Sequence, residues 1–278
     1  MKSFLSVLLC SVCLAVGAQD IHFTQWMHAP QTYAPSTIGD FDGKYRFHAN
    51  YRNQWSSVTV PFVTFAMMAE SNSINSIPGL GVKAGLVYDV TGDSKFSTTH
   101  LDIGAGYSIP MNDSLGEFRI GIQPTITQKK IDLEALTFDN QYNGYVFDGN
   151  LGSGENISKL SQWYFDVSLG MQYQVKLSDK FEARTSFAVF NLLTPKQSFF
   201  KNDDILLDRR WSWQIGGKYN FNDKLEIQPG VQISVQGKFN SINVGSLVDY
   251  NLSKTDYFNQ SIFFGAYFRA VDSGDLIL

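Results

Sequence analysis

Apolar and polar side chains alternate along most of this 278-residue chain. In the segment 163–174, every second residue from Trp163 onwards is apolar or aromatic, whereas the opposite set is mostly polar or small, as at Asp166 and Ser168. Successive side chains of a β-strand point to opposite faces, so sustained alternation predicts a strand with one apolar and one polar face. The sequence therefore predicts an all-β fold.

Eleven segments carry this alternation, and each comes close to the roughly 9–11 residues that a tilted transmembrane strand needs. These segments are 45–51, 58–69, 80–90, 101–109, 118–127, 163–174, 181–189, 211–219, 227–235, 242–250 and 262–268. Strands of soluble proteins usually have about five or six residues. The lengths therefore favour an antiparallel transmembrane β-barrel of the bacterial outer membrane, in contact with lipid, over a soluble β-sandwich or β-helix.

Aromatic and charged residues are distributed as this fold requires. Aromatic residues such as Tyr45, Tyr107 and Trp211 lie near segment ends, where the interface girdles of a membrane barrel belong. Charged residues make up only 17% of the chain, against roughly 25% in soluble domains. We expect the following side chains on the polar faces to line a wet lumen: Arg46, His48, Lys83, His100, Asp102, Arg119, Asp166, Arg184, Lys218, Asp249 and Arg269.

The first 18 residues read as a secretory signal peptide. Lys2 precedes a short apolar stretch, and small residues lead to the expected cleavage between Ala18 and Gln19. A lipoprotein signal would use Cys10 or Cys13, but the residue before each is bulkier than that cleavage usually accepts. Cleavage leaves 21 of the 22 basic residues against 26 acidic ones, and this mildly acidic balance argues against nucleic acid as a partner.

The segment 19–43 lacks the alternation and is rich in aromatic residues and proline. We interpret it as an N-terminal periplasmic arm or plug that precedes a barrel domain spanning 44–278. The arm could plug the lumen or bind a periplasmic partner. The alternative is an ordered lead-in that packs on the inner rim of the barrel.

Connection lengths predict how the barrel is oriented. With the N-terminus in the periplasm, the long connections 128–161 and 190–209 both fall on the extracellular side, and short turns fall on the other. Single-chain bacterial barrels have an even number of strands, whereas eleven are visible here. Either one strand is miscounted or the chain lacks the last strands of a larger barrel of about 14. We favour the second interpretation.

Three short motifs occur in order along the chain. They are Phe23–Met27 with Pro30, then Tyr51–Trp55, then Phe138–Gly144 followed by Phe147–Asp148 and Gly154–Glu155. Together they resemble the PorP/SprF family of type IX secretion system outer-membrane proteins of Bacteroidetes. The chain departs from that family at Ala34–Gly39, where an N-P-A-Y-A-G sequence is usual.

The resemblance implies a role that the alternation does not show. It implies a non-catalytic barrel of the type IX secretion or gliding machinery that assists export or surface attachment of a large adhesin-type cargo. The implied partners are the C-terminal domain of that cargo on the outside and peptidoglycan-associated components in the periplasm. The alternative is a passive outer-membrane porin or solute channel, which the mixed charges on the polar faces would suit.

The motifs and the long connection supply the candidate partner-binding residues. These are Gln25, Trp26, Met27, Pro30, Arg52, Gln54, Trp55, Asp139, Gln141, Tyr142, Gly144, Phe147 and Asp148. Structural roles compete with this interpretation: Trp55 could be a girdle residue and Arg52 an ion-pair partner in the lumen. The long connection, rich in exposed-type aromatics that suit protein recognition, could instead fold inward and occlude the pore.

Catalytic and metal sites are not expected. His100 and Asp102 share a face, as a hydrolase would need, but no nucleophile elbow or cluster with metal-ligand spacing accompanies them. Asp148, Asn150 and Glu155 could ligate calcium, yet they lack the helix–loop–helix pattern. We therefore expect no catalytic residue, no metal and no cofactor.

Overall fold

The computed structural model describes most of the chain after the expected signal peptide. The described residues are 21, 23, 25–54, 56–57, 60–72, 74, 77–92, 94–111, 116–133, 136–152, 154, 160–199, 205–254, 259–270 and 275–277. The expected signal peptide 1–18 lies outside them.

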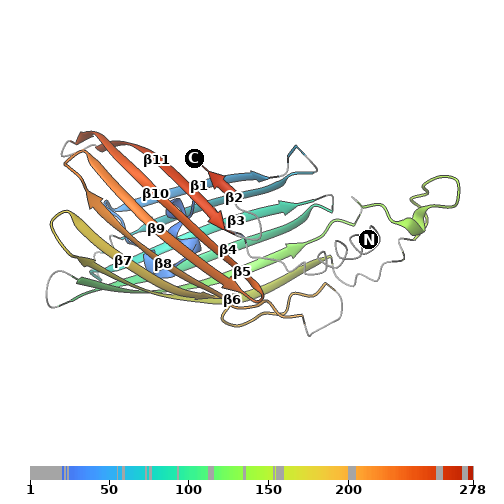
Figure 1. The fold of residues 1–278 in the computed structure, drawn as a ribbon. Coiled ribbons are helices and arrows are strands. Elements are labelled where there is room, and N and C mark those ends of the chain that lie inside the picture. The colour runs from blue at the N-terminus through green and yellow to red at the C-terminus, as the bar shows by residue number, and fades with distance from the viewer. Residues whose placement is uncertain are drawn as a thin grey trace, which may run out of the picture.

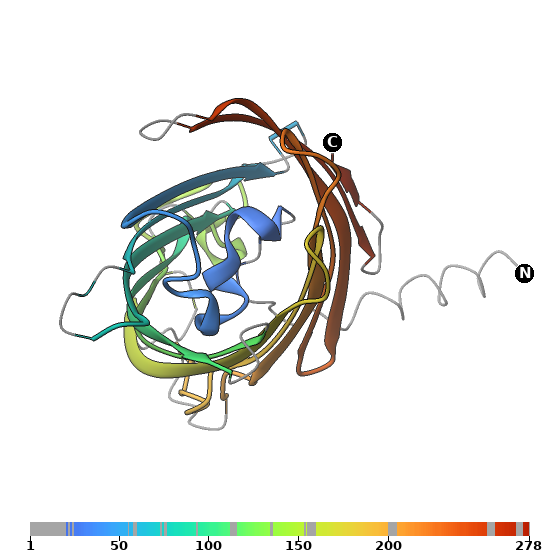
Figure 2. The same cartoon turned by 90° about the vertical axis from the view of Figure 1, so that its left-hand side faces the viewer.

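Within the described residues, eleven long strands and one short strand form a single antiparallel sheet in chain order. They are β1 (Tyr45–Gln54), β2 (Phe62–Ser71), β3 (Leu80–Thr91), β4 (Phe96–Pro110), β5 (Gly116–Lys130), β6 (Ser161–Lys176), β7 (Phe181–Phe190), β8 (Arg210–Asn220), β9 (Leu225–Gln236), β10 (Phe239–Lys254), β11 (Asn259–Ala270) and β12 (Asp275–Ile277). Figure 1 shows the strands, and Figure 2 shows the sheet curving around an interior. The predicted all-β antiparallel fold is confirmed.

The sheet is open in the described residues, where β1 pairs with β2 at one edge and β12 pairs with β11 at the other. Each of the eleven predicted segments contains a strand, although the strand in segment 58–69 begins only at Phe62, and several strands, such as β4 and β5, extend beyond the alternating stretch. The sequence pattern does not predict β12, because three residues are too few for an alternation to show.

The two faces of the sheet have opposite character. The outward Ile103 side chain is 65% exposed, whereas its neighbour Asp102 points inward and is 6% exposed. Apolar side chains such as Phe47 and Phe264 also lie on the outer surface. An apolar outer wall around a polar interior is the arrangement that lipid demands of a membrane barrel. Among the described residues, no helix is long and apolar enough to cross a membrane.

The two ends of the barrel differ in their connections. The 131–160 and 191–209 connections lie at one end, which we call the long-connection end. In Figure 1, the described part of the 131–160 connection projects from that end, on the right, well beyond the strands. The opposite end, here the short-turn end, carries turns such as 177–180 and 221–224 and receives the chain as it enters β1.

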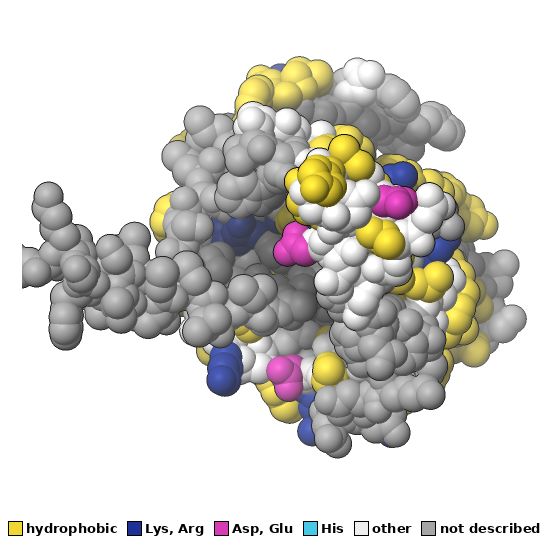
Figure 3. All heavy atoms as spheres, turned by 90° about the vertical axis from the view of Figure 1, so that its right-hand side faces the viewer, with side chains coloured by type: hydrophobic (Ala, Val, Ile, Leu, Met, Phe, Trp, Pro, Cys, Tyr) yellow, Lys and Arg dark blue, Asp and Glu magenta, His cyan; other side chains and the backbone are white. Residues whose placement is uncertain are grey.

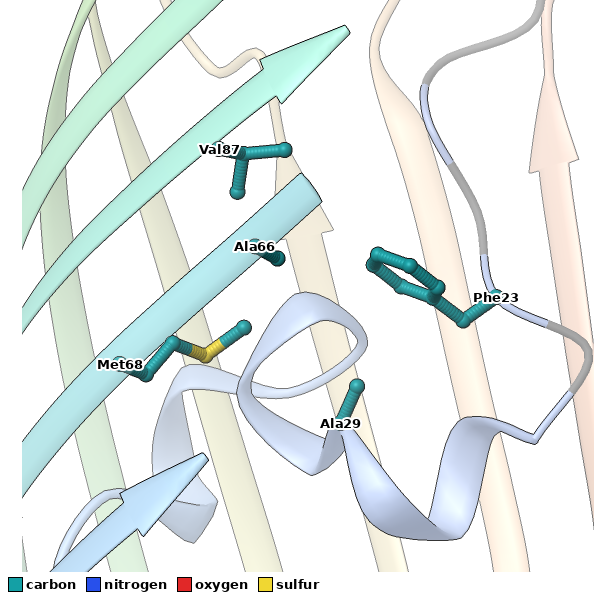
Figure 4. Close-up of a cluster of buried hydrophobic side chains, with 5 residues drawn as sticks. All are labelled: Phe23, Ala29, Ala66, Met68 and Val87. Atoms are coloured by element: carbon teal, nitrogen blue, oxygen red, sulfur yellow. The ribbon is translucent and has the colours of Figure 1, made fainter. Parts of the chain in front are cut away.

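The N-terminal arm lies inside the curve of the sheet (Figure 2, blue). It forms three turns of 3₁₀-helix: η1 (Trp26–His28), η2 (Pro30–Thr32) and η3 (Pro35–Thr37). The buried apolar clusters join this arm to the wall. Figure 4 shows one of them, in which Phe23 and Ala29 of the arm face Ala66 and Met68 of β2 and Val87 of β3. The core of the molecule is therefore the contact between arm and barrel.

Candidate functional site

A row of glycines on the inner wall receives the backbone of the arm. Gly81, Gly106, Gly121 and Gly170 are paired neighbours across β3, β4, β5 and β6. A Cβ atom at Gly121 would fall on the carbonyl group of Pro35, and one at Gly81 would lie 2.5 Å from the Gly39 Cα atom. Only glycine leaves room for a backbone at this distance, so the row seats η3 and the turn that follows it.

The row continues across the barrel with other small inward residues. Gly170 pairs with Ala188 on β7, Ala188 with Ser212 on β8, and Ser212 with Ser234 on β9. These residues have small side chains or none, and η3 of the arm lies against the wall on the β4–β7 side.

Glu70 of β2 ties the arm to the first hairpin. Its side chain is fully buried and accepts hydrogen bonds from the Gly39 backbone N–H, at 3.1 Å, and from the Gln31 side-chain amide. Arg46 of β1 donates to the same carboxylate from Nε at 2.9 Å and from Nη2 at 3.1 Å. One carboxylate therefore holds two points of the arm and one neighbouring strand.

Two buried arginines bind carbonyl groups of the arm. Arg119 of β5 donates to the carbonyl oxygens of Ile38, at 2.9 Å, and Ser36, at 3.3 Å. Arg210 of β8 donates to the Thr32 carbonyl at 2.9 Å and lies 4.1 Å from the centroid of the Phe190 ring. Both arginines bind the main chain of the arm. These contacts therefore depend on the backbone conformation of the arm more than on the identity of its side chains.

Asp40 and Tyr33 are arm residues whose acidity the lumen alters. Asp40 accepts hydrogen bonds from Gln172, at 2.7 Å, and Arg184, at 3.3 Å. Burial alone would raise the pKa of Asp40, but Arg184 and Gln172, together with the charges of Arg119 and Lys218, outweigh burial and hold that pKa below its ordinary value. Burial raises the pKa of the Tyr33 hydroxyl to about 12, although the Arg210 charge opposes the change.

The arm lies between two cavities of the lumen. The cavity at the short-turn end has a volume of about 930 Å³, and Asp40, Arg184 and Lys218 line it. The cavity toward the long-connection end has ≈ 660 Å³ and is lined by Lys83, Asp102 and other polar residues of β3–β6. The arm thus separates the two halves of the lumen.

The 131–160 connection presents a compact turn at its far end. Tyr142 and Phe147 form an isolated antiparallel bridge, and a 3₁₀ turn, η4 (Asp139–Gln141), precedes it. Figure 3 views the long-connection end, where hydrophobic side chains lie on the surface beside a hollow in which basic side chains are visible. In its described part, the connection projects from the barrel and does not fold into the lumen.

Comparison with known proteins identifies the family. Residues 15–277 match the family model described as type IX secretion system membrane protein PorP/SprF. The chain belongs to the PorP/SprF family. The resemblance drawn from the three motifs is thereby confirmed.

Two solved structures are similar in part. One is a FadL homologue from Pseudomonas aeruginosa, with 9% identity over 83% of this chain and 68% of that chain and a TM-score of 0.45. The other is the CymD monoaromatic hydrocarbon channel, with 10% identity over 82% of this chain and 75% of that chain and a TM-score of 0.42. No curated protein matches the chain.

The residues expected to line the lumen of this PorP/SprF protein lie on the inner face. Arg46, Arg119 and Arg184 contact the arm or its carboxylates. His48 lies near Glu70, Lys83 pairs with Asp102 at 2.8 Å, and Arg269 lies near Tyr33. The remaining expected residues follow the same alternation: His100 and Asp166 line one cavity, Lys218 lines the other, and Asp249 lies on the face opposite to the outward Tyr250. Most of this wall therefore faces the arm and the two cavities.

Most arm residues of the first family motif make contacts inside the barrel. Trp26 is buried against Tyr33 and Tyr267, with Met27 packed beside them. Pro30 lines the short-turn cavity, and Gln25 is exposed. The Trp26 ring is therefore packed inside the lumen and is not exposed at the rim of the barrel. Partner binding by this motif stays a prediction.

The residues of the second motif follow β1 toward the long-connection end. Arg52 lies close enough to Tyr33 for its charge to oppose the rise in the Tyr33 pKa that burial causes, so it faces the lumen. Gln54 is half-buried at the end of β1, and Trp55 lies outside the described residues. In the third motif, Asp139, Tyr142, Gly144 and Phe147 are exposed, whereas Gln141 and Asp148 are half-buried.

The suspected histidine–acid pair has other partners. His100 Nδ1 lies 2.7 Å from Thr127 Oγ1, and Asp102 pairs with Lys83. Asp148 accepts hydrogen bonds from Asn150, while Glu155 lies outside the described residues. Across the part of the chain that the structure describes, no three His, Cys, Asp or Glu residues are grouped to hold a metal ion.

Sequence reasoning missed the residues that hold the arm. Glu70, Arg210, Gln31 and Gln172 were absent from the expected sites, although all four are buried. A usable signal existed for Glu70, which is the one acidic residue in the apolar 62–71 strand segment and pairs in register with Arg46. The alternation places such a residue in the lumen, but it does not reveal what it binds.

Proposed function

We propose that this PorP/SprF protein is a non-catalytic outer-membrane component of the type IX secretion machinery that assists export or surface attachment of a large adhesin-type cargo. The observation that carries the proposal is the seating of the arm inside the lumen. Charged residues of the wall, Glu70, Arg119 and Arg210, hold the arm through its main chain. A barrel filled by its own chain is suited to present surfaces to other proteins.

The two ends of the barrel supply those surfaces. The projecting 131–160 connection would face the cell exterior and meet cargo, as long loops do in bacterial barrels. The short-turn end, with its cavity beside Asp40 and Lys218, would face the periplasm and meet peptidoglycan-associated components of the secretion or gliding machinery. This orientation assumes export by the signal peptide 1–18 and cleavage near Ala18.

Deletion of the gene tests the proposal. We expect large surface adhesins to accumulate inside the cell or to be released into the medium, and complementation with the full chain to restore their display. Normal export and retention of every large surface protein in the deletion strain would contradict it.

A passive channel is the second candidate, supported by the mixed charges around the two lumen cavities, such as Lys83, Asp102 and Arg184. Measurements in planar lipid bilayers separate the two. Steady open conductance by the full chain would favour the channel, whereas a near-baseline current supports the assembly role. A catalytic role draws no support from His100 and Asp102, because each is engaged by another side chain.

A further inference from the structure

The tip of the 131–160 connection is a self-supporting hairpin over residues 138–151. Asn143 Oδ1 accepts hydrogen bonds from the backbone N–H groups of Tyr145 and Val146, each at 3.0 Å. Gly144 supplies a backbone φ of +95°, which L side chains rarely adopt. These bonds lie within the tip, so its shape does not depend on contact with the barrel.

The base of the hairpin is closed in the same way. The Asp148 N–H donates to the Gln141 carbonyl at 2.7 Å, and the Gln141 side chain accepts from Phe138 N–H at 3.0 Å and donates to the Leu151 carbonyl. Asp148 Oδ1 in turn accepts from Asn150. A turn so fully bonded is ordered before any partner arrives, which reduces the entropic cost of binding.

This ordered tip displays apolar side chains to solvent. Tyr145 is 90% exposed and Phe147 is 52% exposed, with Tyr142 and Val146 between these values. Aromatic side chains dominate the binding energy of protein interfaces and contribute little when left in water. The tip projects along the barrel, beyond the strand ends (Figure 1), so the membrane that surrounds the strands does not cover it.

The charge of the connection indicates the kind of partner. Residues 131–160 include five acidic side chains, Asp132, Glu134, Asp139, Asp148 and Glu155, against one basic side chain, Lys159. A partner with basic residues around an apolar patch would match both properties, whereas the acidic headgroups of a bacterial surface would be repelled.

We propose that the hairpin tip formed by Tyr142, Tyr145, Val146 and Phe147 is a docking surface for an exported protein that carries an apolar patch bordered by Lys and Arg. This inference rests on the proposed function and names the surface that meets the cargo. The aromatic side chains provide the buried contact area, and the acidic residues steer the partner and make the binding weaken with salt.

Photocrosslinking in producing cells tests this surface. A benzophenone amino acid replaces Tyr145 in the full chain, and a matched control replaces Leu193, which is 53% exposed on the other long connection. We expect the probe at position 145 to form an adduct with an exported protein, identified by mass spectrometry, that protease added to intact cells removes. An adduct with lipid, with a periplasmic protein or with a second copy of the chain would overturn the proposal, as would a yield no higher than at position 193.

A double variant, Tyr145→Ser with Phe147→Ser, separates this inference from the proposed function. We expect roughly tenfold or greater loss of retained exported protein, because aromatic contacts of this kind dominate interfaces. The Leu193→Ser control should retain it normally. If gene deletion abolishes retention but the double variant, present in the membrane at normal level, does not, the docking surface is wrong and the proposed function stands. If deletion has no effect, the proposed function itself fails.

Discussion

At the scale of single residues, the structure is governed by charged side chains that the barrel wall turns inward. A buried ion pair is favourable only when its remaining hydrogen-bonding capacity is satisfied. Glu70 meets this requirement, because Arg46, Gln31 and the Gly39 N–H surround its carboxylate. The arm thus completes a network that the wall alone would leave unsatisfied.

Replacing Glu70 with alanine should release the arm. The change leaves Arg46 without its buried partner and removes two bonds to the arm, a loss of about 3 kcal/mol. Chymotrypsin cleavage after Tyr33, which is buried in the docked arm, should then become roughly 100-fold faster. Glu226→Ala is the control, since Glu226 accepts its hydrogen bond from Gln228 on its own strand. Equal cleavage rates in the two variants would show that Glu70 does not hold the arm.

Docking of the arm should weaken in acid because of Asp40. Its pKa is lower in the folded protein than its ordinary value of 3.8, so it stabilises docking above that value. The contribution is lost as the pH falls from about 3.8 through the lowered pKa. The sequence after residue 18 has no cysteine, so a fluorophore on Gln25→Cys can report arm release. Adding Asp40→Asn should remove this part of the pH dependence; an unchanged titration would exclude Asp40 as its source.

At the scale of elements, the arm can lie against the strands β3–β6 because these strands carry glycines, which have no side chain, at the positions of contact. Glycine inside a strand usually weakens it, and it is placed where another backbone approaches closely. Gly81, Gly106, Gly121 and Gly170 form such a place, since the backbone from Pro35 to Gly39 lies against them. The stability that the strands lose by containing glycine is offset by the contact with η3 and the turn that follows it.

A pair of glycine substitutions on β5 tests this fit. Gly121→Ala would put a methyl group on the Pro35 carbonyl, whereas Gly116→Ala meets only the far end of the Tyr173 side chain, with the hydroxyl at 2.9 Å. Overpacking against backbone costs about 1–3 kcal/mol, so Gly121→Ala should speed cleavage after Tyr33 by roughly tenfold or more. Gly116→Ala should leave the rate near that of the unaltered chain. Similar rates in both variants would contradict the role of the glycine row.

At the scale of the whole molecule, an apolar outer wall surrounds a polar lumen that the arm divides into two cavities. Lipid makes the outer wall favourable, and the arm supplies packing that the polar inner wall cannot provide by itself. The apolar clusters of the described residues accordingly combine arm and wall, as Phe23 with Met68 and Trp26 with Tyr267 do.

Conductance should depend on whether the arm is docked. In planar bilayers, the unaltered chain and Gly116→Ala are expected to stay near baseline. Gly121→Ala and Glu70→Ala should open more often, because each weakens the contact that keeps the arm between the cavities. Steady current through the unaltered chain, unchanged in both arm-releasing variants, would show that the arm does not obstruct the lumen.

Much of the fold was predictable because its rules are local. Alternation with a period of two places Ile103 outward and Asp102 inward without knowledge of any distant residue. The same rule predicted the inward direction of Arg119 and Arg184. It missed β12, whose three residues are too short for a pattern, and it did not identify Glu70 or Arg210 as residues that hold the arm.

The sequence by itself determined the strands, their inner and outer faces and the family, because these depend on residue spacing and short motifs. Only the tertiary structure decided how the arm is held. Arg119 and the Ile38 carbonyl are 81 positions apart, and Arg210 and the Thr32 carbonyl are 178 apart. Such contacts form only when the twisted sheet curves around the arm, and a twist accumulated over many strands leaves no periodic signal in the chain.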